Sequence, residues 1–226
     1  MTGFPLALLL LPVAAPGPAW TQIYQPGWTS HSVRQHPDAG PVEVLKRTVA
    51  GVACFAGTTL VDLPRAALLE VATDIPGSVH WSTAGVKEAE TFARSANGLD
   101  FYQYLALPAW TLSSDRFWFL HGVVEQSPTV SIFRWDRLEG GGPYATRYEA
   151  VLEAHPGAVE PPVNAGGWVF AEDSGLTRIT YYICSDVGGA IPIQVQTLAT
   201  TRTLPDNVGD LVREARQRTE RAASGG

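Results

Sequence analysis

Residues 107–125 read LPAWTLSSDRFWFLHGVVE, and the aromatic and β-branched residues of the second half predict a strand over 116–125. Along this strand both sets of alternate side chains are apolar: Phe117, Phe119 and Val123 on one face, and Trp118, Leu120, Gly122 and Val124 on the other. A strand with one face in water would alternate apolar with polar residues. The sequence therefore predicts that the second face is also buried, either by a partner or by a ligand cavity.

Further strands are predicted on both sides of this one. Runs rich in β-branched and aromatic residues indicate strands at 42–49, 51–62, 99–107, 129–135, 144–154, 166–172 and 176–185. Asp173-Ser174-Gly175 supplies the turn of the last hairpin. Residues 65–73 (RAALLEVAT) follow Pro64 and carry apolar residues at helical spacing, which predicts a helix.

The segment 190–221 has two interpretations. IPIQVQT at 191–197 alternates with period two, as a strand would, but Pro192 and the spacing of Ile191, Val195 and Leu198 also permit a helix. Asp206 can cap a final helix that begins at about residue 207.

The predicted order is a strand pair, a helix, a run of antiparallel strands and a C-terminal helix. An antiparallel sheet with one face covered by helices is an α+β architecture. A strongly curved sheet wrapped around one long helix would leave a cavity between them. We find no internal repeat and no linker that separates two domains.

Three motifs in this order resemble the START family of the helix-grip (SRPBCC) superfamily. The first runs from Trp28 to Arg47 and ends in GPVEVLKR; the second is LPAWTLSSDRFWFL at 107–120; the third is GGWVF at 166–170 followed by TRITYYICSDVGGAIP at 177–192. Together they cover about residues 28–218. The chain departs from the family pattern at three positions: Phe117 replaces an Asp, Val187 replaces a Pro, and Pro205 interrupts the C-terminal helix.

The resemblance implies a helix-grip fold, in which a curved antiparallel β-sheet wraps around a long C-terminal helix. It implies an opening helix before GPVEVLKR, and a helix over 191–204 that covers the cavity. By the family's register, the face of Arg116, Trp118, Leu120, Gly122 and Val124 lines the cavity. The ligand-binding residues expected on this basis are Arg116, Trp118, Leu120, Val124, Tyr102, Tyr104, Val195 and Leu198.

The resemblance also implies that Cys54 and Cys184 lie close together, because the third strand and the last strand of START-like sheets are antiparallel neighbours. We expect a disulfide between them if the protein is exported. Two buried thiols are the alternative.

We expect the protein to bind an apolar small molecule or lipid, to transfer it where exchange allows, and to catalyse no reaction on it. The sequence has no GxSxG nucleophile elbow, and its five histidines never occur at HxH or HxxxH spacing, so we expect no catalytic residue, cofactor or metal. Asp115-Arg116 has two interpretations, a contact to a ligand's polar head or an ion pair that fixes a turn. An SRPBCC-type enzyme (cyclase or hydrolase) and an interaction module with a filled core remain alternatives.

Composition and the ends of the chain bear on partners and location. The 226 residues carry a net charge of −6, which argues against a nucleic-acid partner. Residues 5–15 form an apolar run too short to span a bilayer, so 1–19 is predicted to be a signal peptide and the protein exported to the periplasm or the medium; a cytoplasmic protein is the alternative if this run is not a signal peptide. We further expect a linker at 20–27, one START-like domain over 28–221, a disordered tail at 222–226, a monomer, and transient membrane contact.

Overall fold

The computed structural model describes residues 20–107, 114–186 and 193–225. The elements follow in this order: η1 Trp20–Tyr24, β1 Thr29–His36, β2 Gly40–Val49, β3 Val52–Val61, α1 Arg65–Thr73, α2 Ser78–Trp81, β4 Val86–Ser95, β5 Gly98–Leu105, β6 Arg116–Gln126, β7 Val130–Arg137, η3 Glu139–Tyr144, α3 Ala145–Ala154, β8 Val163–Asp173, β9 Leu176–Asp186 and α4 Ile193–Ser224.

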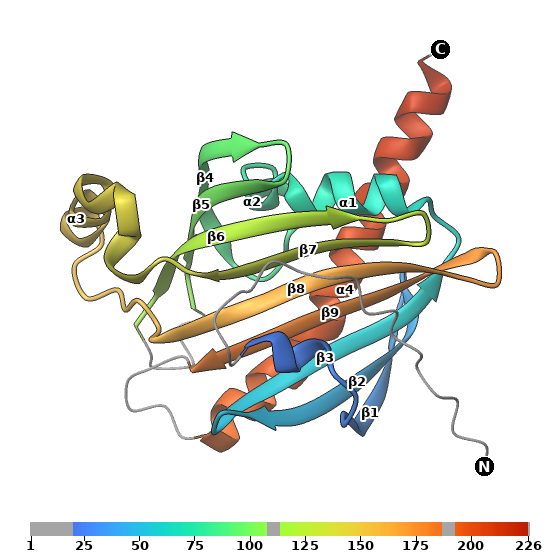
Figure 1. Cartoon of the computed structure of the whole chain (residues 1–226), viewed down its shortest axis with the longest axis horizontal. Helices are drawn as coiled ribbons and strands as arrows, with labels where there is room; N and C mark the ends of the chain where they lie inside the picture. The colour runs from blue at the N-terminus through green and yellow to red at the C-terminus, as the bar shows by residue number, and fades with distance from the viewer. Residues whose placement is uncertain (1–19, 108–113, 187–192, 226) are drawn as a thin grey trace.

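The described strands form one nine-stranded sheet in the order β1-β2-β3-β9-β8-β7-β6-β5-β4. Every neighbouring pair is antiparallel. α1 and α2 carry the chain from β3 to the far edge of the sheet, so the last strand, β9, lies beside β3. The sheet curves around α4, which crosses one face (Figure 1). The predicted helix-grip architecture is confirmed.

The concave face of the sheet holds the main apolar core, together with α1 and α4. Its fully or largely buried members include Phe101, Trp118, Leu120, Phe133, Trp168, Phe170 and Ile179 from the strands, Leu68 and Leu69 from α1, and Val208, Leu211 and Val212 from α4. Gly57 of β3 lets α4 approach closely, because a Cβ at this position would overlap the side chain of Leu204. Helix α4 and strand β3 are therefore in direct contact at Leu204.

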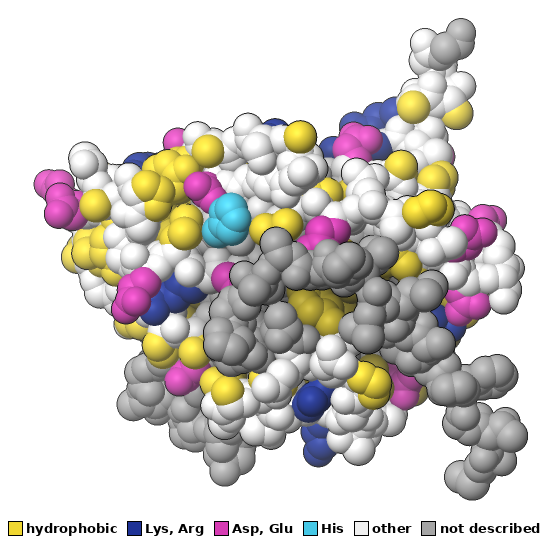
Figure 2. Space-filling model, viewed as in Figure 1, with side chains coloured by type: hydrophobic (Ala, Val, Ile, Leu, Met, Phe, Trp, Pro, Cys, Tyr) yellow, Lys and Arg dark blue, Asp and Glu magenta, His cyan; other side chains and the backbone are white. Residues whose placement is uncertain are grey.

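The convex face is covered at two places by different segments. α3 packs over Phe117 and Phe119 of β6, with the ring centroids of Phe117 and Tyr148 5.5 Å apart. Some of the apolar side chains at this end reach the surface, as Figure 2 shows around α3. η1 covers the middle of the sheet, where Ile23 is 1% exposed and packs with Val49.

The prediction of a strand at 144–154 was wrong, because these residues form the end of η3 and the helix α3. Tyr144, Tyr148 and Val151 recur at helical spacing and meet the apolar outer face of β6. The second apolar face of β6 is thus covered by this helix, which is a part of the same chain.

The N-terminal region also differs from expectation. Within the expected linker at 20–27, Ile23 and Tyr24 pack on the sheet, and Tyr24 Oη donates to the carbonyl of Gly166 over 3.1 Å. The opening helix implied by the resemblance is absent from the described residues before GPVEVLKR, where Thr29–His36 pairs with β2 as an edge strand.

The remaining differences lie at an edge strand and in the last helix. β4 was not predicted, because this edge strand has no buried face with regular alternation. α4 continues through Pro205 to Ser224, so the C-terminal helix is one element and extends into the tail expected from residue 222. The two-residue turn Ser174-Gly175 is as predicted, and both residues have positive φ. The predicted signal peptide at 1–19 lies outside the described residues.

Candidate functional site

Four of the predicted ligand-binding residues lie on the concave face of β6. Arg116, Trp118, Leu120 and Val124 are separated by even intervals and therefore point to the same side of the sheet. Trp118 and Leu120 are buried in the core beneath α1 and α4, and Val124 packs against its margin. The structure thus brings these four residues together on one face, from the start of β6 to near its end.

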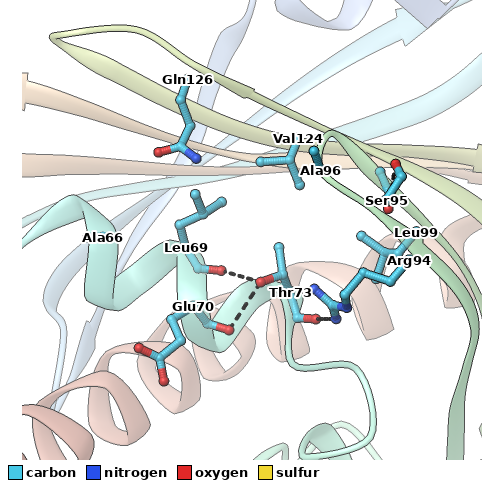
Figure 3. A pocket seen from close by; sticks show the side chains of 11 residues that line it. Ala66, Leu69, Glu70, Thr73, Arg94, Ser95, Ala96, Leu99, Val124 and Gln126 are labelled. Carbon is cyan, nitrogen blue, oxygen red and sulfur yellow. Dashed lines mark hydrogen bonds between the residues drawn. The ribbon is translucent and has the colours of Figure 1, made fainter.

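A partly open pocket of about 310 Å³ lies at the Val124 end of this face (Figure 3). Its walls come from α1, the β4–β5 hairpin and the end of β6: Ala66, Leu69, Glu70, Thr73, Arg94, Ser95, Ala96, Gly98, Leu99, Val124 and Gln126. Arg94 crosses to α1 and donates to the carbonyl of Thr73 over 2.7 Å. The volume falls at the lower end of the range of small-molecule sites.

Arg116 stands at the other end of the same face. It is 2% exposed, and one guanidinium nitrogen donates to the backbone carbonyls of Ser114 and Asp115. Burial lowers the pKa of this guanidinium. The Asp115 carboxylate accepts from Tyr104 Oη at 2.5 Å and from the backbone N–H of Leu107 at 2.8 Å. Both members of the Asp115-Arg116 pair therefore hold the backbone where β6 begins.

Tyr102 and Tyr104 lie on the convex face, away from Trp118. In the register of β5 and β6, Tyr102 is opposite Phe119, whereas Gln103 is opposite Trp118. Tyr102 Oη donates to Glu88 at 3.1 Å. Burial, with the hydrogen bond to Asp115, raises the pKa of Tyr104 to about 12. These two tyrosines are therefore not brought together with the four residues of β6, because successive side chains of a strand point to opposite faces.

Val195 and Leu198 belong to the first turns of α4, and their side chains lie outside the described residues. The second half of α4 is held firmly. The buried carboxylate of Asp210 accepts from the backbone N–H and the hydroxyl of Thr83 at 2.6 and 2.7 Å, and Arg213 pairs with it at 2.6 Å. Arg218 pairs with Asp74 at 2.6 Å.

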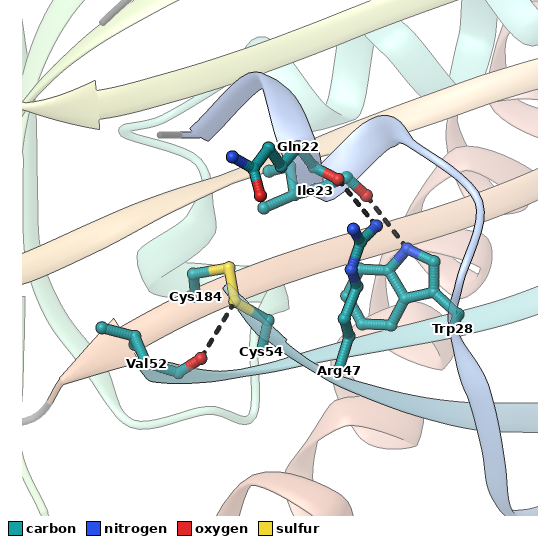
Figure 4. Close-up of a disulfide and its surroundings, with 7 residues drawn as sticks. All are labelled: Gln22, Ile23, Trp28, Arg47, Val52, Cys54 and Cys184. Atoms are coloured by element: carbon teal, nitrogen blue, oxygen red, sulfur yellow. Dashed lines mark hydrogen bonds between the residues drawn. A yellow bond between two sulfur atoms is a disulfide. The ribbon is translucent and has the colours of Figure 1, made fainter. Parts of the chain in front are cut away.

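Cys54 and Cys184 form a disulfide between β3 and β9, with their Cα atoms 4.2 Å apart (Figure 4). The two residues are directly opposite each other in the register. They lie on the convex face beneath η1, where Arg47 donates to the carbonyls of Gln22, Gln25 and Pro26. The disulfide is therefore on the other side of the sheet from the pocket.

Sequence reasoning missed most of the pocket wall. Leu69 and Thr73 were within the predicted helix, but Arg94 lies on the unpredicted strand β4. The residues that line a pocket between a helix and a distant hairpin have no recognisable spacing in the sequence, because they come from separate segments. In the described part of the chain, no three His, Cys, Asp or Glu side chains gather as metal ligands. Nor is any helix there long and apolar enough to cross a membrane.

Comparisons with known proteins give structural matches only. No family model and no curated protein sequence matches the chain. Human STARD10 aligns with a TM-score of 0.71 at 17% identity, over 90% of this chain and 80% of its own. The STAR-related lipid transfer protein of Xanthomonas axonopodis aligns at 0.65 and 20% identity, over 84% and 99%. The Zhui aromatase/cyclase of a Streptomyces species aligns at 0.52 and 12% identity, over 74% and 94%. The fold is therefore of the START type, as the three sequence motifs predicted.

Proposed function

From this START-type fold, we propose that the chain binds an apolar ligand of the lipid class on the concave face of its sheet and shields it from water. The observation that carries the proposal is the aromatic, apolar concave face, which ends in the pocket beside Val124. The STAR-related lipid transfer protein of Xanthomonas, whose fold is similar, supports the same reading.

Burial of apolar surface would drive the binding. At roughly 25 cal/mol per Å², removing about 300 Å² of ligand surface from water contributes about 7.5 kcal/mol, before the costs of ordering ligand and protein. Such a term gives useful affinity without charged anchors. Arg116 is the one buried charge among the described residues of this face of β6. We therefore propose binding without chemistry on the ligand.

Ligand exchange would involve the first half of α4. The second half is joined to the loop after α2 through Asp210 and to α1 through Arg218. Pro205 lies between the halves and supplies no N–H to the helix. We propose that opening of the residues before Pro205 admits the ligand.

Native mass spectrometry of the purified protein, followed by organic extraction, tests the proposal. We expect a non-covalent adduct of lipid mass, and transfer of a fluorescent lipid between vesicles. Val124→Trp, which fills the pocket, should reduce both signals, whereas Val33→Trp on the exposed edge strand should leave them unchanged. Recovery of no apolar adduct, with no transfer, would favour an interaction module with a filled core. Recovery of a chemically altered ligand would favour an enzyme of the cyclase type.

We also propose that the protein is exported. A disulfide persists in oxidising compartments, and residues 5–15 have the apolar character of a signal-peptide core. N-terminal sequencing of protein from the cell envelope or the medium should begin near Trp20. An intact N-terminus on protein found in the cytoplasm would contradict this proposal.

A further inference from the structure

Two buried indole N–H groups of the concave core have no hydrogen-bond acceptor among the described residues. They belong to Trp118 of β6 and Trp81 of α2, and neither Nε1 atom has a hydrogen-bond partner among the described residues. The side chain of Trp118 is 9% exposed and belongs to the concave core, and Trp81 packs against the same core.

The two residues are linked through a short series of contacts. Trp118 is directly opposite Gln103 in the sheet. Gln103 Nε2 donates to Ser78 Oγ at 3.1 Å, and Ser78 begins the helix that Trp81 ends. This hydrogen bond therefore joins α2, which carries Trp81, to the residue of β5 that lies opposite Trp118.

Two other tryptophans of the chain donate their indole N–H to an acceptor within the protein. Trp135, on the same concave face, donates to Asn164 Oδ1 at 3.0 Å. Trp28, on the convex face, donates to the carbonyl of Ile23 at 3.0 Å. Leaving a buried donor unpaired costs about 1–3 kcal/mol. Two such donors on one apolar core are groups with which a hydrogen-bond acceptor on a bound ligand could pair.

The charge on this face restricts what that polar atom can be. Arg116 precedes Trp118 by two residues, points to the same side of β6, and is 2% exposed. A cationic head group would be repelled by the guanidinium and would present hydrogen-bond donors to donors. An oxygen acceptor suits the indole N–H and is not repelled by the positive charge on this face.

We propose that the ligand carries a hydrogen-bond acceptor on its apolar body, such as a ketone, ester, hydroxyl or carboxylate oxygen, and that Trp118 Nε1 donates to it, with Trp81 as a second donor. This inference rests on the proposed function and names its ligand class. It assigns Trp118 as the residue that selects an acceptor over a hydrocarbon or an ammonium group.

Three naphthalenes that differ only in the head group test the inference. 2-Acetylnaphthalene carries a carbonyl acceptor, 2-isopropenylnaphthalene has a CH₂ group in place of that oxygen, and 1-(2-naphthyl)ethylammonium carries a cation. Their dissociation constants are measured by calorimetry on the full chain and on Trp118→Phe, with Trp135→Phe as the matched control. We expect the native protein to prefer the acetyl compound over the isopropenyl compound by roughly 3–10-fold. Trp118→Phe should abolish this preference, Trp135→Phe should keep it, and the ammonium compound should bind most weakly.

A spectroscopic readout keeps the test independent of how well the variants fold. In ¹⁵N-labelled native protein, the Trp118 indole proton should move downfield with the acetyl compound and not with the isopropenyl compound. Equal affinities of these two compounds, or an unchanged preference in Trp118→Phe, would overturn the inference while leaving apolar binding intact. Binding of none of the three would count against the proposed function itself.

Discussion

Replacing both cysteines of the Cys54–Cys184 disulfide should be the most damaging small change on the convex face. The two residues are 130 positions apart, so the bond closes a very long loop in the unfolded chain. In the chain-entropy model, a loop of this length loses about 17 cal/mol/K on closure, which is about 5 kcal/mol at 25 °C. Both residues are fully buried, and alanine would also leave a small void beneath Ile23.

The variant Cys54→Ala/Cys184→Ala is compared with the oxidised native chain by urea unfolding, followed by far-UV circular dichroism and tryptophan fluorescence. We expect a loss of 3–5 kcal/mol in the free energy of unfolding, since measured values commonly fall below the entropic estimate (about 2–4 kcal/mol is typical). The native chain unfolded with a reductant should show a similar loss. A difference below about 1 kcal/mol, or two reactive thiols in denatured, non-reduced protein, would refute the reasoning.

Three further predictions concern stability. Tyr104→Phe removes the hydrogen bond to Asp115 and should cost about 1 kcal/mol at pH 7 in urea unfolding. The same bond lowers the pKa of Asp115, so its stabilisation is present above the ordinary aspartate pKa of about 4 and is lost as the pH falls through the lower native value. If the loss of unfolding free energy caused by Tyr104→Phe grew as the pH fell, that result would contradict this. Asp210→Ala leaves the N–H of Thr83 and a cation without their buried partner, and should cost about 3 kcal/mol in the same assay, whereas a loss under 1 kcal/mol would show that the contact is dispensable. Pro205→Ala restores an N–H to the middle of α4 and should raise the melting temperature, with a gain of up to about 3 kcal/mol; a lower melting temperature would show that the helix requires the proline.

The strands and the architecture could be predicted because their signals are local. β6 to β9 carry runs of aromatic and β-branched residues bounded by turn residues, and the chain order of strands and helices then restricts the architecture. β4 was not predicted, because an edge strand that is half exposed on both faces has no regular alternation of apolar and polar residues. The two-sided apolarity of β6 was read correctly as burial, but its convex face is covered by α3 of the same chain, which was not among the causes we expected.

The covering of the convex face by α3 shows why the remaining site residues could not be predicted from the sequence. α3 was taken for a strand because YATRYEAVLEA fits both periods over so short a length, and only its packing on Phe117 decides for the helix. Once α3 is in place, Tyr102 and Tyr104 belong to its interface and not to the concave face. The unpaired indole of Trp118 had no signal at all in the sequence, since satisfaction of a donor depends on the three-dimensional neighbourhood.

The central claim is that an apolar ligand lies on the concave face of the sheet, between β6 and the helices. Crystals grown with a phospholipid brominated in the middle of one acyl chain would locate that chain by anomalous diffraction. The account predicts bromine peaks on the concave side, within van der Waals contact of Leu120 or Val124. Peaks confined to the convex face or the outer surface, with the concave core filled by its own side chains, would contradict it.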